Sequence, residues 1–330
     1  MRGVLRYRRE DVVAIVDSTR AGETEEGLPV VSSVEDSLRF SPTTALVGVA
    51  TQGGRFPPDW LWLLRDCVVA GLDVENGLHE FLTSDLSLVE LAEQRGVELC
   101  DLRRPPRDLN VPTGANLDVD ATVVLTVGSD CAIGKMTVAL ELDLEARRRG
   151  LRSAFVPTGQ TGMAIAGWGI AVDAVVSDFV AGAAERLLLE AVERGGKDVV
   201  FVEGQGSLLH PAYSGVTLGL LHGSAPDLYV LCHQAGQEFV DDDPRFPIPP
   251  LGELIELHER ISLPAKPARV ACIALNTRFL GEQEARRAIA NAEEETGLPA
   301  DDPVRFGSSK LVEGLLKPGY RADLREERIT

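Results

Sequence analysis

The chain of 330 residues has few cysteines and a shortage of basic residues, and both limit what it can be. Its cysteines stand far apart and form no C-x-x-C pair, which excludes a disulfide framework and a cysteine-rich zinc site; they are Cys67, Cys100, Cys131, Cys232 and Cys272. Such isolated thiols are typical of a reducing compartment, so we expect a cytoplasmic protein. Lys and Arg number 33 against 51 Asp and Glu, and the net charge of −18 argues against binding to nucleic acid or to an anionic membrane.

Long apolar runs are also missing. No stretch of about 18 uninterrupted apolar residues occurs, which excludes a membrane-spanning helix. The basic start of the chain is not followed by the apolar segment of a secretory signal. Hydrophobic residues still make up 44% and charged residues 25%, the balance of a globular chain that buries a core. For a soluble acidic protein of this size we expect a homo-oligomer.

The length favours two domains, because one domain usually takes about 100–200 residues. The segment from Arg103 to Asn116 holds three prolines and a glycine among polar residues, a composition that opposes regular structure. We therefore place a boundary near residue 112, which gives domains of residues 1–112 and 113–330.

The first domain alternates short apolar runs with helical patterns. The patterns predict strands at 12–17, 45–50 and 97–99, and helices at 59–70 and 86–95. Such alternation indicates a parallel sheet covered on both faces. The loop Thr51–Pro58 follows a strand, where ligands bind in such sheets, although a plain glycine-containing turn is the alternative. Arg55 in this loop is a candidate for binding substrate carboxylates.

The second domain repeats the alternation more strongly, and we expect a doubly wound parallel sheet of the α/β class. The patterns predict strands at 121–127, 152–156, 199–202, 228–232 and 270–275, and helices at 135–149, 181–194, 252–260, 281–296 and 308–316.

The most informative stretch is a β-branched strand that runs into a short loop, then Gly-Lys, then a helix, which is the context of a phosphate-binding loop. Backbone N–H groups and the helix N-terminus attract phosphate there, and the lysine reaches the outer phosphates. The predicted cofactor-binding residues are Gly128, Ser129, Asp130, Cys131, Ala132, Ile133, Gly134, Lys135, Met136 and Thr137. A tight strand-to-helix turn with a capping lysine is the alternative.

The match to G-x-x-x-x-G-K-[S/T] is imperfect. Gly128 stands one residue too early, and Met136 replaces the hydroxyl residue that usually binds magnesium. Thr137 follows one step further round the helix, so we treat it as a candidate metal ligand in a displaced position.

Further polar residues follow the neighbouring strands. Glu203 ends an apolar strand and is a candidate magnesium ligand or general base, or otherwise a solvated acid. Gln160 and Thr161 belong to a polar loop that could close over the phosphates. Asp178 could add a second metal-binding carboxylate or cap the helix that starts near Phe179. Asn276 could read the edge of a nucleotide base or stabilise a turn.

Three histidines, His210, His222 and His233, are spaced by 12 and 11 residues, which matches no metal-binding pair on one helix, so we propose no zinc site. His210 follows the Glu203 loop and is a candidate general base, although a lone histidine after an apolar run is more often structural. Cys131 lies near a helix N-terminus, where a thiol pKa is expected to fall, but a loop-packing role is the simpler interpretation.

Taken together, these motifs resemble those of a bacterial two-domain P-loop family, long of unknown function, that includes D-glutamate N-acetyltransferases. The segments that carry the resemblance are 128–137, 159–162, 202–208, 210–211 and 221–226, with 48–54 and 77–79 in the first domain. The resemblance implies a Rossmann-like N-terminal domain followed by a P-loop NTPase-like domain. It also implies acetyl transfer from acetyl-CoA to the amino group of an amino acid, with D-glutamate the expected type of acceptor.

The second domain is also similar to dethiobiotin synthetase, which has a Val-Glu-Gly strand end like Val202–Gly204. That resemblance implies an alternative function, an ATP- and Mg²⁺-dependent C–N ligase, and leaves ATP or GTP with Mg²⁺ as alternative cofactors. A nucleotide-sensing or metallochaperone-like P-loop protein is a third class. The departure at Met136 weakens the metal chemistry more than it weakens phosphate binding.

The leading hypothesis is therefore an N-acetyltransferase with a small-molecule amino-acid substrate and no nucleic-acid or membrane partner. Lys135 would grip the pyrophosphate of acetyl-CoA, and Glu203 or His210 would deprotonate the acceptor. Backbone N–H groups around Gly204 and Gln205 would bind the acceptor and the tetrahedral oxyanion.

Overall fold

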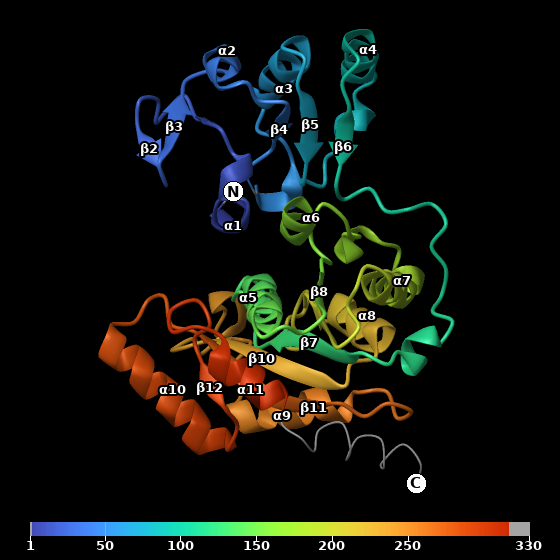
Figure 1. The fold of residues 1–330 in the computed structure, drawn as a ribbon, viewed down its shortest axis with the longest axis vertical. Coiled ribbons are helices and arrows are strands. Elements are labelled where there is room, and N and C mark those ends of the chain that lie inside the picture. Colours follow the sequence, from blue (N-terminus) through green and yellow to red (C-terminus); the bar gives the residue numbers. More distant parts are fainter. Residues whose placement is uncertain (1, 50, 317–330) are drawn as a thin grey trace. The chain divides into compact units, whose positions relative to one another are not determined.

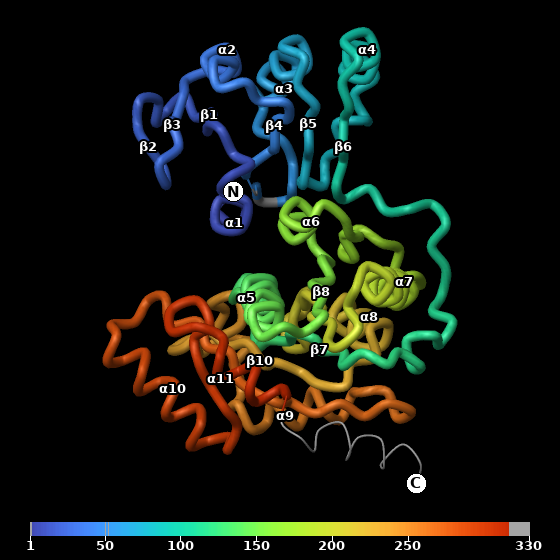
Figure 2. Tube along the Cα trace, in the orientation of Figure 1, coloured from blue at the N-terminus to red at the C-terminus, as the bar shows by residue number. Residues whose placement is uncertain are grey.

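A computed structural model of the chain describes residues 2–49 and 51–316, so residue 50 of the predicted strand 45–50 lies outside the described residues. The chain forms two compact units, Met1–Pro106 with Met163–Ala174, and Arg107–Gly162 with Val175–Thr330. The first change of unit thus falls inside the proline-rich segment 103–116. Figure 2 shows the chain leaving β6 (Leu99–Asp101) along an extended path that has neither helix nor strand up to residue 114.

The first unit contains a parallel sheet of three strands in the order β4-β5-β6, and a smaller sheet in the order β1-β3-β2 (Figure 1). Besides β6, the strands of these sheets are β1 (Ile15–Val16), β2 (Thr24–Glu25), β3 (Leu28–Val31), β4 (Thr44–Leu46) and β5 (Asp73–Asn76). The helices of this unit include α1 (Arg2–Tyr7), α2 (Val34–Ser37), α3 (Trp60–Val69) and α4 (Leu86–Arg95). The predicted helix 86–95 is confirmed, because Asp85 caps its N-terminus and Gly96 ends it with φ +68°.

The core of the first unit lies between the helices and the parallel sheet. Leu64 and Val68 on α3 and Leu88 on α4 are buried together with Val74 of β5. Leu64 and Val68 are four residues apart, so they share one face of the helix and pack into the same cluster.

The second unit contains a six-stranded parallel sheet in the order β12-β11-β10-β7-β9-β8. Its strands are β7 (Thr122–Gly128), β8 (Ser153–Val156), β9 (Val199–Val202), β10 (Leu228–Gln234), β11 (Arg269–Asn276) and β12 (Ala300–Asp301). Its helices are α5 (Lys135–Arg148), α7 (Val180–Glu193), α8 (Ser214–Ser224), α9 (Leu251–Arg260), α10 (Glu282–Thr296) and α11 (Ser309–Leu315). All five predicted strands and all five predicted helices are present to within two residues at each end.

The sheet places the functional residues. Every residue of β8 and β9 is buried, and so is β7 from its second residue on, as expected for a parallel sheet covered by helices. Helix α5 contacts β7, β8 and β9, and α7 and α8 contact each other and the same part of the sheet. Because the strands are parallel, the loops after all of them meet at one edge, where ligands bind in such folds.

The sequence patterns did not predict helices α1, α2, α6 and α8. The Gly159–Gly162 segment, expected to be a flexible loop, instead enters α6 (Gln160–Ala166), so Gln160 and Thr161 lie in a helical turn. Helix α8 was missed because Gly215, Gly219 and Gly223 lower its intrinsic helix propensity. Within the described ranges, every helix is too short or too polar to cross a bilayer.

Candidate functional site

The predicted phosphate loop connects β7 to α5 at the carboxyl edge of the large sheet. Ala132 and Gly134 have φ values of +54° and +112°, so two residues of the loop have a left-handed backbone conformation before the helix begins at Lys135. Gly128 is tightly packed, because a Cβ atom there would lie 2.7 Å from Ile133 Cδ1. The strand, loop and helix follow one another in the order that the sequence predicted for a phosphate-binding loop.

Lys135 is the first residue of α5 and is only 6% exposed. Its Nζ donates a hydrogen bond of 2.6 Å to the backbone oxygen of Asp130, so the lysine folds back over its own loop. Burial lowers its pKa, against the opposing effect of Cys131, Cys232, Asp130 and Glu203. A phosphate that entered the loop would favour the ammonium form of Lys135 by charge pairing.

Asp130 anchors the loop rather than pointing out of it. Its carboxylate accepts hydrogen bonds from the backbone N–H of Cys131 (2.6 Å), from Gln237 Nε2 (2.6 Å) and from the backbone N–H of Asp241 (2.8 Å). Gln237 and Asp241 belong to the segment after β10 and were not identified from the sequence. Two of these donors are backbone groups, which carry no sequence signal.

The expectation that the pKa of the Cys131 thiol falls is wrong. Burial raises its pKa to about 11, although Lys135 opposes the shift. The loss of hydration therefore outweighs the nearby positive charge, and the thiol is protonated at neutral pH. Its neighbour Ser129 is fully buried and ties β7 to β10, since its Oγ lies 2.9 Å from His233 Nδ1.

Glu203 follows β9 and is 3% exposed. One carboxylate oxygen accepts hydrogen bonds from the backbone N–H groups of Thr158 (2.9 Å) and Gly159 (3.2 Å), and the other accepts from Gln205 Nε2 (3.0 Å). A Cβ atom on Gly162 would lie 2.3 Å from Glu203 Oε2. The side chain therefore fixes the path of the chain after β8, and it is not a solvated acid.

Gly204 packs directly on β7. Its backbone N–H donates to Thr126 Oγ1 (2.9 Å), and a Cβ atom there would lie 1.7 Å from the backbone oxygen of Thr126. This N–H is thus already used, which removes it from the set expected to stabilise an oxyanion. The residue must be glycine because the two strands approach so closely.

Asn276, at the end of β11, also supports the loop. Its Nδ2 donates to the backbone oxygen of Ile133 (3.0 Å), and its Oδ1 accepts from the backbone N–H of Arg278 (3.2 Å). The amide thus links the end of β11 to the phosphate loop and to the turn that follows the strand.

The predicted metal ligands Thr137 and Asp178 belong to different elements. Thr137 is half-buried in the first turn of α5, next to Met136, and Asp178 is exposed in the 3₁₀ turn η7 (Ser177–Phe179). Asp178 does not cap α7 either, since that helix begins after Phe179 with no side-chain hydrogen bond at its N-cap. In the part of the chain that the structure describes, Asp130, Cys131 and His210 form the cluster with metal-ligand chemistry.

Arg55 belongs to the first unit, on the loop between β4 and α3, and its side chain is exposed. The loop is held at Gly54, where a Cβ atom would lie 2.5 Å from the ring of His79. Glu80 closes the same loop, because its backbone N–H donates to the oxygen of Gly54 (3.0 Å) and its carboxylate accepts from the N–H of Phe56 (2.9 Å).

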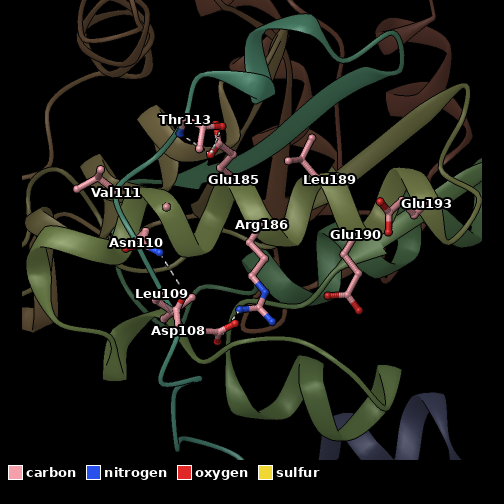
Figure 3. Close-up of a pocket in the computed structure, with 11 residues that line it drawn as sticks. Asp108, Leu109, Asn110, Val111, Thr113, Glu185, Arg186, Leu189, Glu190 and Glu193 are labelled. Atoms are coloured by element: carbon pink, nitrogen blue, oxygen red, sulfur yellow. Dashed lines mark hydrogen bonds and ion pairs between the residues drawn. The ribbon is translucent and has the colours of Figure 1, made fainter.

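A hollow of about 490 Å³ lies elsewhere in the second unit, along α7 and the segment 108–113. Figure 3 shows Arg186 and Asp108 directed toward one another, and their ion pair measures 3.0 Å. Glu185 accepts hydrogen bonds from the backbone N–H groups of Thr113 (2.6 Å) and Gly114 (2.8 Å). The hollow contains none of the site residues predicted from the sequence. Its polar groups bind the segment 108–113 to α7.

Comparisons with known proteins agree with this architecture. A P-loop domain of unknown function, DUF1611_C, matches residues 110–312, and the Rossmann-like domain DUF1611_N matches residues 17–105. The crystal structure of a DUF1611 family protein from Anabaena variabilis ATCC 29413 superposes with a TM-score of 0.90 at 41% identity, covering 96% of this chain and 94% of that one.

Two curated relatives are named D-glutamate N-acetyltransferase. The protein from Tritonibacter scottomollicae is 37% identical over 284 residues, and the one from a Pseudoalteromonas species is 33% identical over 284 residues. Each alignment covers 86% of this chain and 84% of the relative. The chain belongs to the DUF1611 family, with a Rossmann-like N-terminal domain and a C-terminal P-loop domain.

Proposed function

We propose that the chain is an amino-acid N-acetyltransferase, with acetyl-CoA as donor and a D-glutamate-like amino acid as acceptor. The alignment with two relatives of that name over most of both chains carries this proposal. In the reaction the acceptor ammonium loses one proton, its nitrogen forms a bond to the acetyl carbon, and the carbon–sulfur bond breaks. The nitrogen loses a second proton, and the departing thiolate takes up one to leave as the CoA thiol.

The phosphate loop supports acetyl-CoA as the proposed donor. Acetyl-CoA carries a diphosphate, and the loop offers backbone N–H groups, a helix N-terminus and Lys135. Acetyl transfer needs no nucleotide hydrolysis, and the absence of a hydroxyl at Met136 is compatible with a donor that requires no magnesium there.

The same geometry limits what the loop residues do. The long pantetheine arm of acetyl-CoA separates the diphosphate from the thioester, so a loop that holds the diphosphate is remote from the acetyl carbon. Glu203 then holds the backbone of the donor site, and Lys135 supplies its positive charge. The acceptor loses its proton near the thioester, at the far end of the pantetheine arm. Glu203 suits this role because its carboxylate is already committed to Thr158, Gly159 and Gln205.

The test is release of CoA thiol from acetyl-CoA with D-glutamate, L-glutamate, D-aspartate and D-glutamine, with the product identified by mass. We expect acceptor-dependent thiol release, fastest with D-glutamate, and an added mass of one acetyl group. Phosphate release from ATP and Mg²⁺ without thiol release would instead support the C–N ligase. No acetylated product with any amino acid would refute the proposal.

A further inference from the structure

His210 lies between β9 and α8, and its ring is held in one orientation. The residue is 8% exposed, and the ring packs against that of Tyr213 at a centroid distance of 4.6 Å. Its Nδ1 accepts a hydrogen bond of 3.1 Å from the backbone N–H of Ala212. A ring this tightly placed has a defined direction for its second nitrogen.

The contact with Ala212 selects the tautomer. A backbone N–H can only donate, so Nδ1 must present its lone pair, and the proton of the neutral ring is on Nε2. A general base at Nε2 would need the opposite tautomer, and that tautomer would set two N–H donors against each other. His210 therefore offers a hydrogen-bond donor at Nε2.

The ring lies at the phosphate loop. One of its nitrogens, a carboxylate oxygen of Asp130 and the sulfur of Cys131 lie within 4.8 Å of one another. These atom types could hold zinc, but zinc needs a lone pair on the nitrogen and a thiolate. The lone pair of Nδ1 is used by the N–H of Ala212, Nε2 carries the proton, and burial raises the pKa of the Cys131 thiol to about 11. The cluster is thus better suited to donate hydrogen bonds than to bind a cation.

The loop also needs such a donor. It contains the carboxylate of Asp130, which repels anions, and Lys135 Nζ already donates one hydrogen bond to the backbone oxygen of Asp130. We propose that His210 Nε2–H donates a hydrogen bond to a phosphate oxygen of the acyl donor and completes the anion site of the loop. This inference rests on the proposed function and assigns His210 to donor binding instead of proton removal.

The experiment measures the affinity of the full chain for CoA and for inorganic pyrophosphate by calorimetry, for the wild type and for His210→Phe, His210→Gln and His222→Gln. His222 is the matched control, since its Nε2 lies 3.2 Å from the backbone oxygen of Ile261, away from the loop. We expect His210→Phe to weaken both affinities about ten- to a hundredfold, as for one hydrogen bond to a charged group. His210→Gln, which keeps a donor but cannot act as a base, should stay within about threefold of the wild type, as should His222→Gln.

Thermal unfolding of each variant separates lost binding from lost folding. Unchanged CoA affinity in a folded His210→Phe variant would overturn the inference, even if the chain acetylates D-glutamate. Equal losses in the Phe and Gln variants would overturn it too, as would tight Zn²⁺ binding abolished by both substitutions. A wild type that binds neither CoA nor pyrophosphate would also refute it. If the wild type acetylates none of the amino acids but the variants still differ in their affinities for CoA and pyrophosphate, the proposed function alone would be refuted.

Discussion

At the scale of single residues, Glu203 is a buried carboxylate that organises the backbone around it. It accepts hydrogen bonds from Thr158, Gly159 and Gln205, and the small size of Gly162 makes room for it. Removing such an acceptor leaves buried donors unpaired, which is costly. The role of Glu203 can therefore be separated from that of a base by comparing two substitutions.

We expect Glu203→Gln to keep kcat within about threefold of the wild type, because Gln205 can rotate its amide and accept the new N–H. Glu203→Ala should raise the KM for acetyl-CoA at least about tenfold, since Thr158 and Gly159 lose their acceptor. Steady-state kinetics with both substrates checks this. A loss of kcat beyond about a hundredfold in Glu203→Gln would show that the carboxylate is the base.

At the scale of elements, the contact between α7 and α8 depends on glycines that lower the helix propensity of α8. A Cβ atom on Gly223 would lie 2.1 Å from the backbone oxygen of Ala181, and one on Gly219 would lie 2.3 Å from Val180 Cγ1. The close approach of the two helices thus requires glycine at these positions. Gly215, in the first turn of α8, has no atom within 4 Å of the same position.

Gly223→Ala should lower the free energy of unfolding by about 1–3 kcal/mol, because the backbone of α7 cannot move aside locally. Gly215→Ala is the matched control and should be neutral or should stabilise by up to about 1 kcal/mol, as alanine favours helix. Urea unfolding measures both. If the two substitutions changed the free energy of unfolding equally, the close contact between α8 and α7 would not be the reason that Gly223 is required.

At the scale of the whole molecule, stability should depend on pH through buried His258. Its Nδ1 lies 2.7 Å from the backbone oxygen of Leu254, and among the described residues its Nε2 has no hydrogen-bond partner. Burial lowers its pKa from 6.5 to about 4. The folded state therefore keeps the ring neutral while the unfolded state takes up a proton below pH 6.5, so stability is lost as the pH falls toward 4.

This histidine should contribute a loss of about 1.5 kcal/mol between pH 6.5 and pH 5, because the slope rises toward about 1.4 kcal/mol per pH unit as the pH falls below 6.5. His258→Met removes the titrating group, so its unfolding free energy should fall less steeply over that range than that of the wild type. Parallel slopes for the two proteins in urea unfolding at several pH values would contradict the pKa assigned to His258.

The sequence predicted the large sheet well because its strands are buried on both faces and appear as unbroken apolar runs, such as Val199–Val202. The sequence patterns did not predict β5 in the sheet of the first unit, because Asp73 and Glu75, at its less buried positions, leave no unbroken apolar run. The phosphate loop could be predicted from local spacing. Its support could not, since Asp241 reaches Asp130 from 111 residues further along the chain through a backbone N–H.

The central claim, that the loop from Gly128 to Lys135 holds the acyl donor, is tested most directly by thermal unfolding with CoA and with ATP, each with and without Mg²⁺. A ligand at about 100 times its Kd stabilises the folded state by about 2.7 kcal/mol. We predict a rise in Tm with CoA that is lost in Lys135→Ala and kept in Lys197→Ala, which changes an exposed lysine before β9. A shift with CoA that survives in Lys135→Ala, or a shift with ATP and Mg²⁺ alone, would contradict the account.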